Sequence, residues 1–452
     1  MDPPVPGRAF AGGVAVACAA GLALRLVYAF VVKAGAILQG DAFYYHGQAR
    51  LNLEGHWFVD PQVFLARPTV PALIPSAQHP PLFTLLLTAG DLVGAGSVNA
   101  QLVLVCLLGT ATIAVTALVA RDLVSPRAGL IAAVVAALYP GFWIFDGEVM
   151  SEALVMLLAA LTILVANRCF ADFTVRRLVL LSLLTGLCAL TRAELVLLVP
   201  LVALPTVLWQ HQIAWRRRAV LVALAVAVAV APMVPWFVRN TVVFHQPVFL
   251  SDQLPITLAS ANNPSTYSGP LTGSWCYTCL LSTHFPLSEN EAQAGAYWDT
   301  RARRYIEAHK VRAVEVGIDR VGLEWGFFEP VRHAQQNFLE GWPTPVSEAW
   351  LFWSYPLMAL AVAGAILLRR RRRPVYPLVA MVVVVTVSAF ATYGGSRFRA
   401  EGEVALVVLA AVALDALWSA LAGPPGTGRA TRPEVPSTAE GTAHNVPEEV
   451  TV

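Results

Sequence analysis

The sequence predicts an all-α polytopic membrane protein, and its composition and the spacing of its apolar runs both support this fold class. Of the 452 residues, 57% are hydrophobic and only 13% are charged, and the mean hydropathy of +0.61 excludes a water-soluble globule. The basic residues fall in short clusters between the apolar runs, which is typical of topology signals. A net charge of +2 does not indicate a nucleic-acid partner.

About ten apolar runs are candidates for membrane-spanning helices. A spanning helix needs roughly 20 largely apolar residues, and shorter ones are tolerated where a bundle thins or tilts. The candidates, in order, are Phe10–Val32, Val98–Ala120, Ala128–Phe145, Val149–Ala166, Leu178–Leu190, Leu195–Trp209, Ala219–Val238, Ala349–Leu368, Pro374–Tyr393 and Val404–Leu421.

One further apolar run, Pro80–Val93, decides the topology. Cytoplasmic loops carry an excess of arginine. If Pro80–Val93 does not span and the N-terminus is inside, all four basic clusters are cytoplasmic; they are Arg121/Arg127, Arg168/Arg176/Arg177, Arg216–Arg218 and Arg369–Arg373. The sequence therefore predicts a short interfacial helix at Pro80–Val93, in a multi-pass protein of the plasma (inner) membrane with both termini in the cytoplasm.

This topology divides the chain into four parts. Residues 1–238 form an N-terminal transmembrane region that includes a first external loop, 34–97. Residues 239–348 form a mostly helical extracytoplasmic segment, in which Ser288–Phe328 has the spacing of amphipathic helices. Residues 349–422 hold the C-terminal transmembrane helices. Residues 423–452, rich in Pro, Gly, Thr and Glu, are expected to be a disordered cytoplasmic tail.

The predicted topology places polar residues from distant parts of the chain on one side of the membrane. Charges at the hydrocarbon boundary cost free energy unless they are paired or face a wet cavity, so this convergence predicts a site. The alternative is that they are only the charged helix ends of any multispan protein. The set comprises Asp41, His79, Asp146, Glu148, Arg192, Glu194, Arg239, Asn240, Arg397 and Arg399, with the segment Thr241–Glu348.

Four carboxylates, three of this set and Glu152, are candidates for chemistry. Asp41 directly follows the first span, where it could serve as a general base toward an acceptor hydroxyl, as a metal ligand, or only as the cap of the next helix. Glu148 and Glu152 are four residues apart and would share a helical face, so either one is protonated or a cation lies nearby. Asp146 could equally mark a solvated helix end.

The cationic candidates lie at helix boundaries. Arg239, Arg397 and Arg399 could bind phosphate oxygens, or they could extend toward lipid headgroups. His79 could hydrogen-bond a phosphate or be an interfacial polar residue. Arg25 lies within the first apolar run, where an unpaired charge is costly, and it is expected to face the bundle and to pair with a carboxylate or reach toward the external cavity.

Cys276 and Cys279 lie in the extracytoplasmic segment, on the oxidising side of the predicted topology. A local disulfide is the favoured interpretation, followed by free thiols and then a metal site, since a lone CxxC lacks the second ligand pair of a structural zinc site.

The order of the motifs over nearly the whole chain resembles the GT-C class of membrane glycosyltransferases, in the family 39-like branch of protein O-mannosyltransferases and lipid A aminoarabinose transferases. One departure is Ala193, which stands where the family commonly has a proline. The motifs are the Arg25-bearing first span, Gly40-Asp41-Ala42-Phe43-Tyr44-Tyr45, His79-Pro80-Pro81-Leu82, Tyr139-Pro140 leading to Ser151-Glu152, Leu190–Glu194, Pro235–Asn240, Asn262-Asn263-Pro264, Tyr305–His309 and Phe398-Arg399.

The resemblance implies a GT-C fold and an inverting glycosyltransferase that uses a polyprenyl-phosphate-sugar donor, with Asp41 as base. A second acidic residue is implied within Asp146–Glu148, and a divalent metal nearby is compatible with the acidic cluster. Implied substrate-binding residues are His79, Tyr44, Tyr45, Glu152, Arg239, Asn240, Asn262, Arg397 and Arg399. The implied acceptor is an extracytoplasmic protein, glycolipid or glycan, and membrane lipids surround the enzyme.

Two rival functions suit a multispan protein with intramembrane charges. The main rival is a transporter or lipid-linked sugar flippase, and the other is a non-catalytic scaffold whose external segment binds partners. Against transport, the two halves of the chain show no repeat, and the polar residues gather toward one face instead of the midplane.

Overall fold

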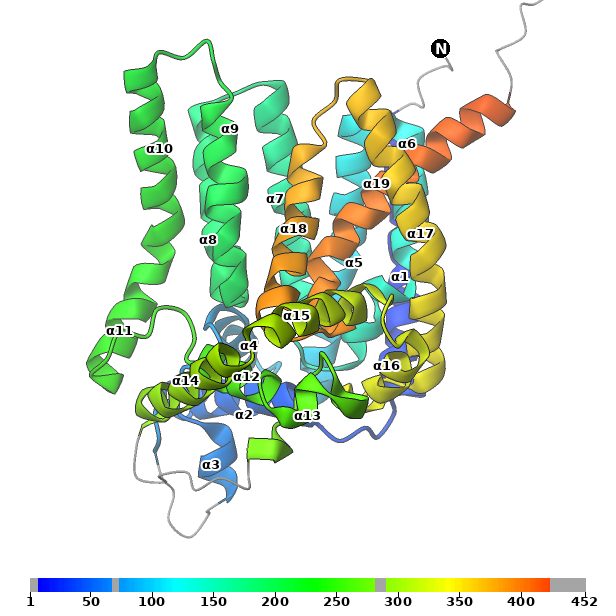
Figure 1. Cartoon of the computed structure of the whole chain (residues 1–452). Coiled ribbons are helices and arrows are strands. Elements are labelled where there is room, and N and C mark those ends of the chain that lie inside the picture. Colours follow the sequence, from blue (N-terminus) through cyan, green and yellow to red (C-terminus); the bar gives the residue numbers. More distant parts are fainter. Residues whose placement is uncertain (1–6, 67–72, 281–289, 423–452) are drawn as a thin grey trace, which may run out of the picture.

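The computed structural model describes residues 7–66, 73–280 and 290–422, and these form helices joined by short connections, with one isolated β-bridge between Val59 and Pro75. The predicted tail, 423–452, lies outside the described residues. Most of the long helices stand upright side by side (Figure 1). The upright set is α1 (Gly7–Val27, continued by the π-helical turn Tyr28–Val32), α5 (Val98–Leu123), α6 (Pro126–Leu138), α7 (Glu152–Ala171), α8 (Val175–Thr191), α9 (Leu204–Leu208), α10 (Trp215–Val230), α11 (Val234–Phe244), α17 (Thr344–Arg370), α18 (Tyr376–Ala391) and the tilted α19 (Ala400–Leu421).

A second group of helices gathers at one end of this bundle, called here the site end (Figure 1). It consists of α2 (Gly40–Leu53), α3 (Pro61–Ala66), α4 (Leu82–Leu92), α12 (Gln253–Ala261), α13 (Pro264–Tyr267), α14 (Glu291–Ala308), α15 (Lys310–Trp325) and α16 (Pro330–Gln336). Single turns complete the chain: η2 (Pro140–Phe142), η3 (Ile144–Gly147), η4 (Ala193–Leu197), η5 (Val199–Ala203), η6 (Ala231–Met233), η7 (Gly269–Leu271), η8 (Thr278–Leu280), η9 (Asn337–Glu340) and η10 (Ser396–Arg399).

Six helices in the described part of the chain are long and apolar enough to cross a membrane. They coincide with six of the ten predicted spans and make this a multi-pass membrane protein. The other four predicted spans correspond to the shorter helices α6, α8 and α18 and to the run Ala193–Leu208. How many of these cross the bilayer stays a prediction, and α4 forms the helix expected within Pro80–Val93.

The predicted span Ala128–Phe145 was wrong as a single helix. The α-helix ends at Leu138, and two 3₁₀ turns follow it. Pro140 explains the break, because proline has no backbone N–H to donate and disfavours helical geometry in the residue before it. The consequence is that Asp146 and Glu148 lie on irregular backbone at the site end, where their side chains diverge.

The core of the bundle lies around α7 and α19. The share of buried residues in an apolar stretch of 18 residues is 78% for α7 and 61% for α19, against 28% for α1. Close packing is built on small residues. A Cβ added at Gly364 of α17 would lie 1.9 Å from the carbonyl oxygen of Leu409 on α19, so these two helices approach as closely as only glycine permits.

Arg25 is completely buried in the bundle and is satisfied there. Its Nε donates to Asp146 Oδ2 at 2.6 Å, its Nη1 to the carbonyl oxygen of Gly21 at 3.1 Å and its Nη2 to that of Phe142 at 2.9 Å. The expected carboxylate partner of Arg25 is therefore confirmed. Gly109 makes room for this pair, because a Cβ there would lie 2.3 Å from Asp146 Oδ2.

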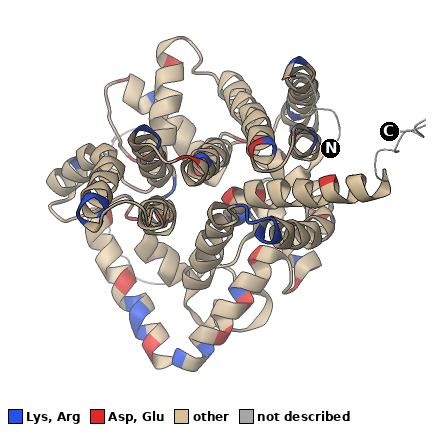
Figure 2. Cartoon of the chain, turned by 90° about the horizontal axis from the view of Figure 1, so that it is seen from above, with Lys and Arg blue, Asp and Glu red and all other residues tan. Residues whose placement is uncertain are grey.

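The helices α14 and α15 meet in a V that projects beside the bundle when the chain is viewed along the upright helices, and charged residues are spread along both limbs (Figure 2). Helix α14 begins with a capping box, in which Asn290 and Gln293 satisfy each other's backbone N–H groups. These two helices confirm the helical spacing predicted for Ser288–Phe328, of which residues 288 and 289 lie outside the described residues.

Candidate active site

A cavity of about 1250 Å³ opens at the site end, between the first loop, the bundle and the segment that carries α12 to η9. Its lining includes charged and polar residues, among them Asp41, His79 and Arg397. It also includes apolar residues, among them Val196, Leu197, Phe249, Leu254 and Val387. A cavity lined by residues of both kinds suits a ligand that combines a polar group with a hydrocarbon chain.

Asp41 enters this cavity from the first turn of α2. Gly40, whose φ of +50° suits glycine, turns the chain into the helix, and the N-cap position belongs to Gln39. The capping alternative for Asp41 is therefore wrong. The acidic side chain at the helix N-terminus is instead free to contact groups in the cavity, where the helix dipole favours its ionised form.

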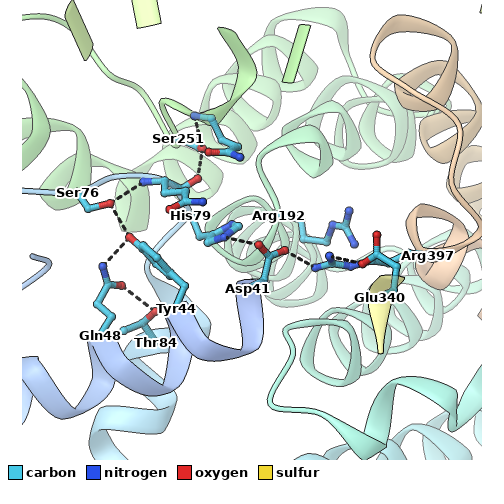
Figure 3. Close-up of polar contacts among 12 residues, drawn as sticks. Asp41, Tyr44, Gln48, Ser76, His79, Thr84, Arg192, Ser251, Glu340 and Arg397 are labelled. Atoms are coloured by element: carbon cyan, nitrogen blue, oxygen red, sulfur yellow. Dashed lines mark hydrogen bonds and ion pairs between the residues drawn. The ribbon is translucent and has the colours of Figure 1, made fainter. Parts of the chain in front are cut away.

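Asp41 lies between two nitrogen-bearing side chains (Figure 3). Arg397 donates from Nη2 to Asp41 Oδ2 at 2.8 Å, and His79 Nε2 lies 3.3 Å from Oδ1. Burial by itself would raise the pKa of Asp41, but the charge of Arg397, together with His79, outweighs it and holds this pKa well below its usual range. The carboxylate is therefore ionised at neutral pH.

Arg397 is shared among three carboxylates. Besides Asp41, its Nε donates to Glu152 and its Nη1 lies 3.3 Å from Glu340 Oε2. Arg192 lies on the other side of Glu152, at 3.4 Å, and also pairs with Glu194 at 2.8 Å. The residues between Asp41 and Arg192 thus form a chain of alternating charges along the cavity wall.

The expected cation beside Glu148 and Glu152 is present. Glu148 pairs with Lys33, which also donates to the carbonyl oxygen of Gly341 at 2.6 Å, and Glu152 pairs with Arg397. Since each carboxylate has its own cation, their proximity does not require either one to be protonated.

His79 is positioned by its neighbours on both sides. Its ring lies 4.8 Å from that of Tyr45 and 5.0 Å from that of Tyr44, measured between centroids. Tyr44 shares a hydrogen bond of 2.6 Å with Ser76 and accepts one from Gln48 at 2.7 Å (Figure 3). This buried network holds the rings against which His79 packs.

The backbone leading to His79 is held by residues from distant parts of the chain. Arg239 donates to the carbonyl oxygens of Ser76 and Phe58, both at 2.9 Å, and Ser251 donates to that of Gln78 at 2.5 Å. These bonds satisfy main-chain acceptors that adjoin the isolated β-bridge between Val59 and Pro75.

Comparisons with known proteins were made on the sequence and on the fold. The family model described as dolichyl-phosphate-mannose-protein mannosyltransferase matches residues 78–236. The oligosaccharyltransferase of Archaeoglobus fulgidus, solved with Zn and sulfate, is 17% identical with a TM-score of 0.55, and the match covers 90% of this chain and 49% of that one. The chain has the GT-C fold.

The archaeal oligosaccharyltransferase AglB from Archaeoglobus fulgidus, solved with an inhibitory peptide and a dolichol-phosphate, is 16% identical with a TM-score of 0.54, and the match covers 91% of this chain and 50% of that one. The chain thus spans about half the length of these solved structures. ArnT from Cupriavidus metallidurans bound to undecaprenyl phosphate is 17% identical with a TM-score of 0.43, and the match covers 91% of this chain and 79% of that one. Comparison with curated proteins gave no match.

The GT-C resemblance seen in the sequence is confirmed, but the predicted site residues fall into two groups. Asp41, Tyr45, His79, Glu148 and Arg397 line the cavity. The others do not contribute to its lining. These are Tyr44, Asp146, Glu152, Arg239, Asn240, Asn262 and Arg399.

Several residues of the second group have structural partners of their own. Arg399 is buried and pairs with Glu403 at 2.6 Å, and Asn240 donates to the carbonyl oxygen of Val248 at 3.3 Å. Asn262 accepts hydrogen bonds from Arg320 and Tyr267. Their positions support a role in building this GT-C site and leave the substrate roles implied for them without geometric support.

Sequence reasoning missed Lys33 and Glu340, which both line the cavity. Lys33 directly follows the first apolar run, and that signal could have identified it as a charge at the membrane boundary. Glu340 lies in a segment of ordinary composition, 299 residues after Asp41 in the chain, so no local pattern indicates its position beside Arg397.

The described residues contain no group of three or more His, Cys, Asp or Glu side chains placed to hold a metal ion. Three carboxylates, those of Asp41, Glu152 and Glu340, instead face the guanidinium of Arg397. We therefore assign no residue to the divalent metal that the acidic cluster suggested.

The predicted disulfide joins Cys276 and Cys279. The segment that contains it is also tied to its surroundings by hydrogen bonds from Cys276 N to the Ser260 carbonyl oxygen at 3.0 Å and from Gly394 N to that of Gly273 at 2.9 Å. Trp275 and Tyr277, which flank Cys276, are thereby held at the cavity wall.

Proposed function

We propose that this protein is an inverting glycosyltransferase that moves a sugar from a polyprenyl-phosphate-linked donor to an acceptor hydroxyl on the extracytoplasmic side of the membrane. The observation that carries the proposal is an ionised carboxylate, Asp41, in a cavity lined by both charged and apolar residues. The matched family is named for a dolichyl-phosphate-sugar donor, and a structural neighbour was solved with dolichol-phosphate.

The charged and apolar residues of the cavity lining suggest how the donor binds. A lipid-linked donor stays in the bilayer, so its hydrocarbon chain would lie against the apolar residues and its phosphate against the guanidinium of Arg397. The sugar then projects toward Asp41. An acceptor on a protein, glycolipid or glycan would enter from the open side of the cavity.

The chemistry requires one proton transfer and one displacement. The acceptor oxygen forms a bond to the anomeric carbon while its proton passes to Asp41. The bond from the anomeric carbon to the phosphate oxygen breaks, and the polyprenyl phosphate leaves with the electron pair. Arg397 stabilises the charge that grows on the phosphate.

Replacement of Asp41 by asparagine tests this proposal. The Asp41→Asn variant should insert into membranes normally and lose transfer of labelled sugar from a polyprenyl-phosphate donor. Asp60→Asn is the matched control, since Asp60 belongs to the same loop, caps α3 by accepting from Gln62 N at 2.7 Å and does not line the cavity. Full transfer by Asp41→Asn would exclude Asp41 as the base.

The rival function, a transporter or lipid-linked sugar flippase, gains no support from the comparisons. Release of polyprenyl phosphate from a sugar-loaded donor by purified protein would separate transfer from transport.

A further inference from the structure

All three nitrogen positions of the Arg397 guanidinium face a carboxylate: Nη2 faces Asp41, Nε faces Glu152 and Nη1 faces Glu340. One positive charge is thus shared by three acidic side chains, and the nearby Arg192 neutralises Glu152 only in part, because it also pairs with Glu194 and Glu401. Under the proposed function, Arg397 binds the donor phosphate. Each nitrogen of its guanidinium, however, already faces a carboxylate.

The three carboxylates differ in how firmly they are held. Glu152 is fully buried in the first turn of α7, inside the bundle. Asp41 has a 2.8 Å bond to Arg397 and a second contact with His79. Glu340 lines the cavity and makes the longest of the three contacts, 3.3 Å, while its side chain, at 23% exposure, is about as accessible as that of Asp41 at 26%. Glu340 is therefore the partner that Arg397 loses most easily.

The backbone around Glu340 is anchored independently of its side chain. Gly341 follows it with a φ of +81°, and the carbonyl oxygen of Gly341 accepts a hydrogen bond from Lys33, which is itself paired with Glu148. A rotation of the Glu340 side chain away from Arg397 can thus occur without moving the turn that carries it.

Building on the proposed function, we propose that Glu340 is a placeholder for the donor phosphate, whose oxygens replace its carboxylate on Nη1 of Arg397 when the lipid binds. Guanidinium groups bind carboxylate and phosphate oxygens with the same fork of N–H donors, so the exchange keeps the geometry of Arg397. Glu340 is a positioning residue in this scheme, because it acts through Arg397 and touches no reacting atom.

The test measures binding of a polyprenyl phosphate without sugar to the purified full chain in detergent. Glu340→Gln removes the competing anion and keeps the size of the side chain, so we expect the dissociation constant to fall roughly fivefold to tenfold. If Glu340 had a merely structural role, Glu340→Gln would bind the polyprenyl phosphate more weakly than the wild-type chain or equally well. Unchanged or weaker binding by Glu340→Gln would overturn the proposal.

A thermodynamic cycle separates the placeholder from a general loss of negative charge. In an Arg397→Lys background, or in Arg397→Gln where the lysine variant does not fold, Glu340→Gln should no longer tighten binding. Equal tightening in both backgrounds would refute the placeholder. Thermal melting of each variant confirms that it is folded before binding is compared.

The proposed function and this inference can fail separately. Transfer of labelled sugar by the wild-type chain, without tightening in Glu340→Gln, would refute the placeholder and leave the transferase. Tightening that depends on Arg397, in a chain that transfers no sugar from any donor offered, would support the placeholder and count against the transferase.

Discussion

Replacing Asp146 by asparagine separates a structural role from a catalytic one for the residue that sequence reasoning placed among the catalytic acids. The structure buries Asp146 to 1% exposure and pairs it with Arg25, itself 0% exposed, at 2.6 Å. The substitution keeps the shape of the side chain and removes its charge, so Arg25 would remain buried with neutral acceptors alone, among them the carbonyl oxygens of Gly21 and Phe142. Removing one partner of a buried pair costs about 3–5 kcal/mol.

In detergent, we expect Asp146→Asn to melt at least about 5 °C below the wild-type chain. Asp122→Asn is the matched control, because Asp122 also pairs with arginines but is 22% exposed, where an ion pair contributes about 0–1 kcal/mol. The double variant Arg25→Gln with Asp146→Asn should regain part of the loss, since neither charge is then buried alone.

The refuting result is a chain that melts normally and fails to transfer sugar. That outcome would show Asp146 acting in catalysis, against its burial outside the cavity lining. A lowered melting temperature with transfer proportional to the folded fraction would assign Asp146 to the bundle and leave Glu148 as the second acidic residue at the cavity.

Three further predictions follow from the same structure. Gly109→Ala should destabilise the chain by about 1–3 kcal/mol, because its Cβ would collide with the buried ion pair of Arg25 and Asp146. As a control, Gly12→Ala in α1 places its Cβ where no atom lies within 4 Å, and it should be neutral or slightly stabilising. Equal melting temperatures of the two variants would contradict the packing argument. Because the pKa of Asp41 is held well below its ordinary value near 3.8, Asp41 should stay ionised throughout the range from pH 7 to pH 5, and its protonation should add no acid limb to the transfer rate there. A rate that falls between pH 7 and pH 5 in the wild-type chain but not in Asp41→Glu would contradict this expectation. Reduction of the Cys276–Cys279 disulfide should lower stability by about 2 kcal/mol, the value for so short a loop, and an unchanged melting temperature in Cys276→Ser would count against it.

The sequence alone determined the membrane class and most of the helices, because the cost of exposing polar backbone and charged side chains to lipid acts on each run of residues separately. The same local logic identified Asp41 beside the first span, and the order of weak motifs was enough to indicate the GT-C fold. It also paired Arg25 with a carboxylate, since a charge buried in an apolar helix needs a partner, but it could not say which one.

Only the tertiary structure decided which charges meet. Arg397 and Asp41 are separated by 356 positions in the chain, and Glu340 reaches the same guanidinium from a third segment. Whether an arginine at a helix end faces a cavity, as Arg397 does, or a main-chain carbonyl, as Arg239 does, depends on how the helices pack. Hydropathy gives the depth of a residue in the membrane but not its direction around the bundle axis, so the identity of each partner had to come from the folded chain.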